Sequence, residues 1–218
     1  MLTIRDPPFR IPPKPPFPWG ASPFRARGIL YRDQIAHVDR ALAPLGTSVD
    51  ELVRRTGDRA LEVFLSQPFD SMSWYDLQPG VWAIEIVASH RGITPAHQIR
   101  ESVVALVDGS LRGFSGVLLK VLSNEAVASW LPRISTWFHD FGALETHVVD
   151  RGHVRGVRHG VPSFFVQLWA ESATCFIERV LERVGAKEPR AYTLNVEPDG
   201  VNGPVTLYRI PFEVRWTP

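Results

Sequence analysis

A long amphipathic helix near the C-terminus is the feature that most restricts how this chain can fold. The pattern predicts this helix over residues 163–184, and Gly185 ends it. Charged residues lie mostly on one side of the helix, and the other side is largely apolar. The apolar stripe consists of Phe165, Leu168, Trp169, Phe176, Val180 and Val184. Such a stripe is stable only when a sheet or other helices cover it.

Segments rich in β-forming residues lie on both sides of this helix. Before it, residues 147–149 and 154–157 flank a turn at 150–152; after it come residues 191–196 and 205–216. Strand pairs on both sides can supply the sheet that the apolar stripe needs. The expected fold class is therefore α+β, with an N-terminal helical bundle followed by a ββαββ unit that carries a small antiparallel sheet.

Helical patterns fill most of the chain before residue 143. Ser48 and Glu51 form a capping box at the start of one helix, and Gly57 interrupts it. Residues 81–90 are compatible with a helix or a buried strand, and the helical neighbours and the glycine at 92 favour the helix. The other helices are expected over residues 31–43, 60–65, 94–107, 114–130 and 132–142.

The first 23 residues differ from the rest because eight prolines lie between Pro7 and Pro23. Proline fixes φ and removes a hydrogen-bond donor, so this segment is expected to be extended. We divide the chain into an extended proline-rich arm, residues 1–23, and one α+β domain, residues 24–218. Arg10, Pro13 and Pro16 match a peptide-ligand pattern, and the alternative is an arm that Phe9, Phe17 and Trp19 anchor onto the domain or a second subunit.

Composition excludes several classes of protein. The 218 residues are 44% hydrophobic and 22% charged, with a net charge of +1, so nothing indicates binding to nucleic acid or an anionic membrane. Cys175 is the only cysteine, which rules out an intramolecular disulfide and a thiolate metal cluster. No apolar run is long enough for a membrane span, and the prolines replace the apolar core of a secretory signal. We expect a cytoplasmic protein without a cofactor.

The layout of the chain resembles a superfamily that includes vinyl-reductase-type small-molecule-binding domains, haem nitric-oxide-binding domains and TRAPP vesicle-tethering subunits. More narrowly, it resembles a large family of uncharacterised myxobacterial paralogues. The residues that carry this resemblance are 27–31, Trp74 and Tyr75, Glu101 and Ser102, Pro132, Arg133, Trp137, Gly142 and 183–186. The resemblance covers about residues 27–216, and it implies ligand sensing or protein assembly, often as a dimer.

Two signatures of these relatives are missing. The haem-binding relatives hold haem with a histidine and a Tyr-x-Ser-x-Arg motif; His139 lies near the expected position of the histidine, but the motif does not occur. The clustered cysteines of vinyl-reductase-type domains are also absent, since Cys175 is alone. The resemblance therefore does not carry over a haem site or a cysteine site.

Candidate functional residues fall into two groups. Three histidines of the first strand pair, His147, His153 and His159, have even spacing, but the turn separates them and does not secure a metal site. The contact-surface candidates are Arg151, His153, Arg155, Arg158 and His159 of this basic hairpin, with Phe17 and Trp19 of the arm. The pocket candidates are Trp130, Trp137, Phe141, Phe165 and Trp169, which form either core or the wall of a ligand cavity.

These observations leave three hypotheses for function. The leading one is a non-enzymatic regulatory or assembly module that acts through protein contacts, as a homodimer. The second is a sensor that binds a small apolar ligand in an aromatic pocket between helices and sheet. The third is a haem- or metal-binding protein. No catalytic residues are predicted, because no Gly-x-Ser-x-Gly, phosphate loop or dinucleotide motif occurs.

Overall fold

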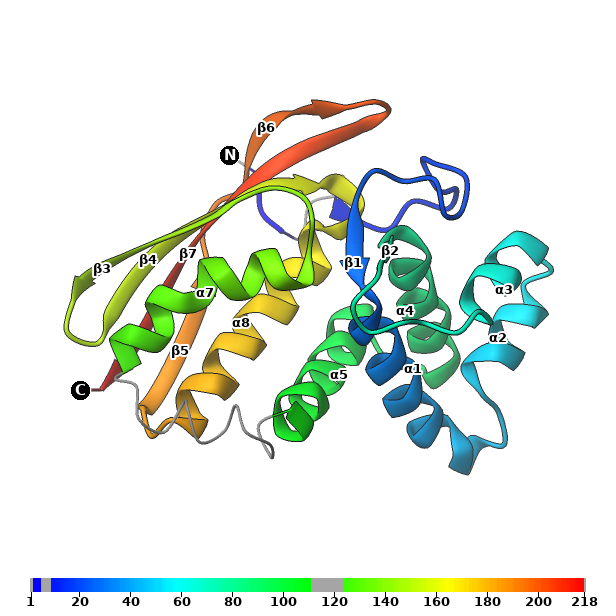
Figure 1. The fold of residues 1–218 in the computed structure, drawn as a ribbon, viewed down its shortest axis with the longest axis horizontal. Coiled ribbons are helices and arrows are strands. Elements are labelled where there is room, and N and C mark those ends of the chain that lie inside the picture. The colour runs from blue at the N-terminus through cyan, green and yellow to red at the C-terminus, as the bar shows by residue number, and fades with distance from the viewer. Residues whose placement is uncertain (1, 5–8, 111–123, 218) are drawn as a thin grey trace.

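A computed structural model describes residues 2–4, 9–110 and 124–217. Helices α1 to α5 lie together on one side, and a sheet with helices α7 and α8 lies on the other (Figure 1). The helices are α1 (Gly28–Leu42), α2 (Val49–Arg55), α3 (Arg59–Leu65), α4 (Gln78–Arg91), α5 (Pro95–Ser110), α7 (Asn124–Phe138) and α8 (Val166–Arg183), with short 3-10 turns η2 (Ala43–Leu45) and η3 (Ser163–Phe165). The strands are β1 (Arg25–Arg27), β2 (Trp74–Asp76), β3 (Leu144–Asp150), β4 (His153–Pro162), β5 (Lys187–Thr193), β6 (Glu197–Asn202) and β7 (Val205–Thr217). The α+β class is confirmed.

The helical side follows the local signals of the sequence. The Ser48 hydroxyl accepts a hydrogen bond from the Glu51 backbone N–H at 3.2 Å, so the predicted cap of α2 is present. Residues 78–91 form the helix α4, as favoured, and the left-handed Gly92 ends it. None of the described helices combines the length and the apolarity that crossing a membrane requires.

A two-stranded sheet of β1 and β2 joins the two sides, and the sequence did not predict it. Each strand has three residues, too few to show a pattern. The buried carboxylate of Asp76 holds this region by accepting hydrogen bonds from the backbone N–H groups of Gly20, Ser22 and Gln78 at 2.9, 3.2 and 2.8 Å. Gly28 is required beside it, because a Cβ there would lie 2.0 Å from the Asp70 carbonyl oxygen.

The larger antiparallel sheet has the order β3-β4-β7-β5, and β6 also pairs with β7. Its inner face is buried, with Val154, Ile210 and Val214 each 0% exposed. On the outer face, Arg155 and Arg215 make ion pairs with Glu213. This alternation is typical of a sheet that packs against a core on one side only.

Two details of the predicted helices and strands are wrong. Three strands follow α8, not two, because the polar strand β6 contains Pro198 and Gly200 and lacks a β pattern. Pro132 does not begin a helix but lies inside α7. The predicted helix over residues 114–130 lies largely outside the described residues.

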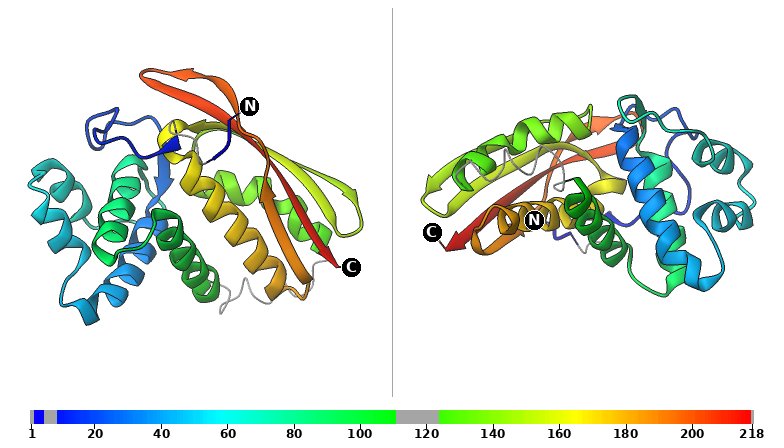
Figure 2. Two further views of the ribbon diagram at one scale, coloured as in Figure 1. Left: turned by 180° about the vertical axis from the view of Figure 1, so that it is seen from behind. Right: turned by 60° about the horizontal axis from the view of Figure 1, so that its bottom comes forward.

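Helix α8 connects the sheet to the helical side. It lies along β5 (Figure 2, left) and packs against α5. The Asp108 carboxylate on α5 accepts hydrogen bonds from Arg179 Nε and Nη2, both at 2.9 Å, and from Arg183 Nη2 at 2.6 Å. Cys175 is buried in the same contact, where burial raises the pKa of its thiol and its S–H donates to the Arg100 carbonyl oxygen.

The described part of the proline-rich arm packs onto its own domain. Phe9 is 1% exposed, and its ring meets Tyr208 of β7 edge-on at 4.8 Å. Gln78 fixes Phe17 through hydrogen bonds to the backbone N–H at 3.2 Å and the carbonyl oxygen at 2.8 Å. The Trp19 indole N–H donates to Asp58 at 2.7 Å. The arm therefore contributes to the core of the same chain.

Replacing Phe9 by alanine tests this role of the arm. We expect Phe9→Ala to lower the free energy of unfolding by about 3–5 kcal/mol, because the buried ring leaves a cavity. Urea unfolding measures the change. Lys14→Ala, at an exposed position of the same arm, is the control and should change stability by less than about 0.5 kcal/mol. Equal effects of the two substitutions would contradict the docked arm.

The pairing of Asp108 with Arg179 is tested by a double-mutant cycle. Both side chains are partly exposed, at 24% and 31%, so solvent screens the pair and we expect a coupling free energy of about 0.5–1 kcal/mol. The cycle uses Asp108→Asn and Arg179→Gln with urea unfolding. Asp50 and Arg54, a more exposed pair within α2, provide the reference cycle, which should give the smaller coupling. A coupling no larger than that of the reference pair would show that this contact does not join the two helices.

Candidate functional site

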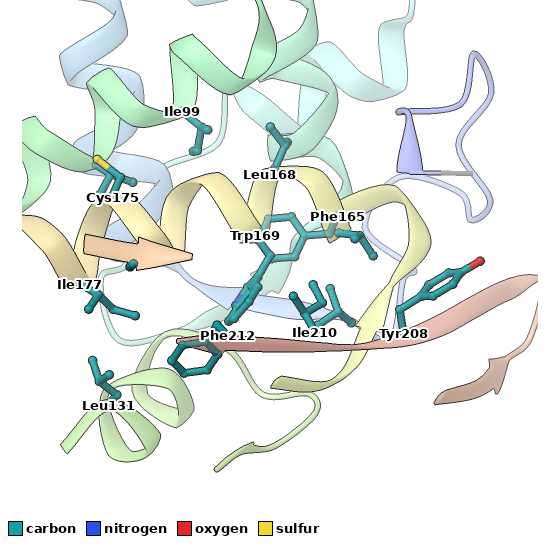
Figure 3. Packing of buried hydrophobic residues seen from close by; sticks show 14 of the residues in the cluster. Ile99, Leu131, Phe165, Leu168, Trp169, Cys175, Ile177, Tyr208, Ile210 and Phe212 are labelled. Atoms are coloured by element: carbon teal, nitrogen blue, oxygen red, sulfur yellow. The ribbon is translucent and has the colours of Figure 1, made fainter. Parts of the chain in front are cut away.

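An apolar cavity of about 170 Å³ lies where the helical side meets the sheet. Side chains from α1, α4, α5, α7, α8 and β7 form its wall. Trp169 of α8 and Phe212 of β7 lie side by side there (Figure 3). Their ring centroids are 6.3 Å apart. Phe138 of α7 meets Phe176 of α8 edge-on at 6.2 Å. Because these rigid rings meet at steep angles, they leave space between them that small side chains do not fill.

The structure separates the predicted pocket residues into two groups. Phe165 and Trp169 line the cavity. Trp130 and Trp137 do not: they are 40% and 39% exposed, because they lie on the outer side of α7. Phe141 lies behind the wall, where its ring packs edge-on against Phe24 at 5.4 Å.

One corner of the cavity is polar. Ser135 and His139, one turn apart at the end of α7, line it. Arg158 of β4 reaches the same corner: its Nη1 donates to Ser135 Oγ and its Nη2 to the Phe141 carbonyl oxygen, both at 2.5 Å. Leu144, the strand partner of Arg158 on β3, is also part of the wall.

Arg158 corrects the prediction of a basic contact surface. Its side chain is fully buried, because Arg158 shares the inner face of the sheet with its strand partner Ile210. Burial lowers the pKa of its guanidinium to about 10, which still leaves it charged at neutral pH. Its Nε has no hydrogen-bond partner, and the described residues offer it no carboxylate.

The other contact-surface candidates lie on or near the outer face of the sheet. Arg151 is exposed at the hairpin turn, and Arg155 pairs with Glu213 at 2.7 Å. His153 and His159 are partly buried, 3.6 Å from Glu213 and 3.4 Å from Asp199. Phe17 and Trp19 are half-buried against the domain.

The histidines do not converge on a metal site. Within the described ranges, no group of three or more His, Cys, Asp or Glu side chains could hold a metal ion. His147 is exposed on β3 and lies opposite Arg155, so it is separated from the other two histidines.

His139 is neutral at physiological pH. Burial, and to a smaller extent the charge of Arg158, lowers the pKa of its imidazole to about 3. Its ring packs against Phe141 and Phe165 at 5.4 and 5.6 Å, and part of its surface faces the cavity. A neutral imidazole can donate one hydrogen bond and accept another.

Sequence reasoning missed Ser135 and the inward direction of Arg158. Alternate residues of a strand lie on the same face of the sheet, so Val154, Gly156 and Arg158 of β4 share the inner face. This alternation could have predicted the direction of Arg158 from the sequence. Ser135 carries no comparable signal, because its role depends on the strand that packs beside α7.

Comparison with solved structures shows that this chain has the fold of H-NOX domains. A structure from a study of haem distortion in the H-NOX family is 10% identical and covers 88% of this chain and 95% of its own, with a TM-score of 0.63. An oxygen-binding H-NOX domain related to soluble guanylate cyclases, in its oxygen complex, is also 10% identical. It covers 88% of this chain and 95% of its own, with a TM-score of 0.62. The Fe(II) unliganded H-NOX protein from K. algicida is 10% identical and covers 88% of this chain and 97% of its own, with a TM-score of 0.59. No family model and no curated protein matches the sequence.

These findings overturn the leading hypothesis from the sequence, a module that acts through protein contacts. The chain shares its fold with haem-containing and oxygen-binding domains. Its basic hairpin is also not a uniform contact surface, because Arg158 points into the core. The second hypothesis, a ligand pocket between helices and sheet, agrees better with both observations.

Haem itself does not fit this site. The cavity of about 170 Å³ is smaller than the roughly 300–1,000 Å³ that drug-sized ligands occupy, and haem is at least of that size. His139 could serve as an axial ligand by its chemistry, since it is neutral and faces the cavity. However, Arg158 is the only cation that the described residues place at the polar corner, and the Tyr-x-Ser-x-Arg motif is missing.

The neutral state of His139, which is only partly exposed, predicts a pH dependence of stability. Between about pH 3 and 6.5 the unfolded chain binds a proton here that the folded chain does not bind, so stability falls as the pH drops through this range. From pH 7 to pH 5 we expect His139 to account for about 2 kcal/mol of lost stability. His139→Phe should remove this part of the loss, as measured by urea unfolding at both pH values.

His90→Phe is the control, because His90 is exposed at the end of α4. This variant should keep the wild-type difference between pH 7 and pH 5. If His139→Phe also keeps that difference, the histidine is protonated in the folded protein and the buried neutral state is wrong.

Proposed function

We propose that this protein is a non-enzymatic sensor domain that binds a small apolar ligand in the cavity between its helices and its sheet. The observation that carries the proposal is the cavity itself, whose walls consist mainly of Ile, Leu, Val, Phe and Trp side chains. Water gains few hydrogen bonds in such a space, whereas an apolar ligand is removed from water when it enters.

The size of the cavity limits the ligand. An engineered cavity of about 150 Å³ with similar walls stays dry and binds benzene or xenon. The present volume of about 170 Å³ therefore suits a ligand with one ring or a short branched chain. Trp169 and Phe212 offer ring faces and edges to such a ligand.

The position of the cavity supports a sensing role. Its wall combines Val81 and Ile99 from the helical side with Phe138, Trp169 and Phe212 from the side of the sheet. A ligand in this cavity contacts both sides at once. It therefore stabilises the relative position of the helical side and the sheet that fits it best. The solved structures with the same fold include an oxygen-binding H-NOX domain, which supports the binding of a small ligand as the role of this chain.

The finer predictions from the sequence remain predictions. They are the resemblance to vinyl-reductase-type, TRAPP and myxobacterial paralogous proteins, a homodimer, a protein partner and a cytoplasmic location. None of them is needed for ligand binding in the cavity.

Thermal unfolding with benzene, toluene and ethylbenzene tests the proposal. A ligand present at about ten times its Kd stabilises the folded state by about 1.4 kcal/mol, which corresponds to roughly 3–6 °C for a chain of this size. Ala173→Phe places a ring in the cavity and should abolish this shift. Trp137→Ala, on the outer side of α7, is the control and should keep it.

Two results would contradict the proposal. One is the absence of a shift with every apolar probe in the wild-type protein. The other is an equal shift in wild type and Ala173→Phe, which would place binding elsewhere on the protein. Titration with haemin adds a check on the fit of haem: we expect no stoichiometric complex with a sharp Soret band.

A further inference from the structure

The buried guanidinium of Arg158 needs an explanation that the apolar cavity alone does not give. Isolated charges are costly to bury, and buried arginines are normally paired with a carboxylate. Arg158 is 0% exposed, its two hydrogen bonds go to a neutral hydroxyl and a backbone carbonyl, and its Nε is unpartnered. Its charge is therefore uncompensated within the described ranges of the chain.

The surroundings of Arg158 connect this charge to the cavity. Ser135, which accepts a hydrogen bond from Arg158 Nη1, is part of the cavity wall. His139 is also part of the wall, and it is close enough for the charge of Arg158 to affect its pKa. Leu144, the cross-strand neighbour of Arg158, is part of the wall as well. The positive charge thus lies directly behind one corner of a mostly apolar wall, whose other polar members are Tyr31, Gln34, Ser102 and Ser172.

The corner also presents hydrogen-bond donors. Ser135 Oγ already accepts from Arg158, so its own O–H is available to donate, and no acceptor for it occurs in the described part of the chain. The neutral His139 ring can supply an N–H. Arg158 polarises the serine hydroxyl and makes it a better donor.

Resting on the proposed function, we infer that the ligand is a small apolar carboxylate, whose apolar body fills the aromatic cavity and whose carboxylate group binds at the corner of Ser135, His139 and Arg158. The carboxylate accepts hydrogen bonds from Ser135 and His139, and it compensates the charge of the guanidinium behind them. A neutral ligand of the same shape would leave that charge uncompensated. The site therefore selects for charge as well as for shape.

The local backbone holds this corner in place. Gly142 turns the chain from α7 into β3 with φ of 64°, and a Cβ there would lie 2.1 Å from the His159 carbonyl oxygen. This tight turn brings the Phe141 carbonyl oxygen onto Arg158 Nη2. The Arg158 guanidinium also lies over the Phe141 ring, 5.4 Å from its centroid.

The test compares two probes of the same shape, 4-methylbenzoate and 4-methylbenzamide, by isothermal titration calorimetry with the full chain at pH 7.5. Wild-type protein should bind the benzoate at least about tenfold more tightly than the benzamide, because charge-assisted hydrogen bonds are the stronger ones. Ser135→Ala and Arg158→Met should each reduce this preference to less than about threefold, with affinity for the benzamide little changed.

Arg155→Met is the matched control, because it removes an arginine from the outer face of the same strand. It should keep the preference for the benzoate. Ser135→Ala keeps the test valid if Arg158→Met does not fold, since the serine is only partly buried.

The outcomes separate this inference from the proposed function. Equal affinity of wild type for both probes, or a preference that survives both Ser135→Ala and Arg158→Met, would overturn the carboxylate site while leaving an apolar pocket intact. If neither these probes nor the apolar series binds, the proposed function fails as well. Loss of preference in the Arg155→Met control would show that long-range charge, and not this corner, selects the ligand.

Discussion

The packing of α8 is the contact on which both sides of the molecule depend. Its apolar stripe meets the inner face of the sheet through Trp169 and Phe212, whose rings lie 6.3 Å apart. Its opposite side packs on α5, where the Asp108 carboxylate accepts hydrogen bonds from Arg179 and Arg183. Burial of the stripe is the main stabilising term, since each large apolar side chain contributes about 1.5–3 kcal/mol. The ion pairs are partly exposed and mainly fix the register of the two helices.

The same packing creates the cavity. Aromatic side chains from α7, α8 and β7 approach one another at steep angles, and rigid rings cannot collapse into the space they enclose. The chain thus has the fold of H-NOX domains, and its interior holds a small cavity, a neutral His139 and a buried Arg158. These features fit a compact ligand with an apolar body better than a large macrocycle.

Sequence periodicity was sufficient to predict the α+β class, the cap of α2 and the long helix α8, because these depend on local spacing. It was not sufficient for β1, β2 and β6, which are short or polar and exist through their pairing partners. For the site, the apolar stripe of α8 was enough to suggest Phe165 and Trp169 as cavity residues. The choice among the aromatic side chains of α7 depends on how this helix is rotated about its axis. That rotation placed Trp130 and Trp137 outside and Phe138 inside, which no local pattern determines.

Crystallography of the protein under xenon pressure tests the central claim most directly, because xenon binds in apolar cavities without needing polar contacts. The account predicts a xenon site between Phe138, Trp169 and Phe212, with the surrounding side chains little moved. A structure in which these rings close the space and no xenon binds there would contradict the cavity and the ligand-binding function built on it.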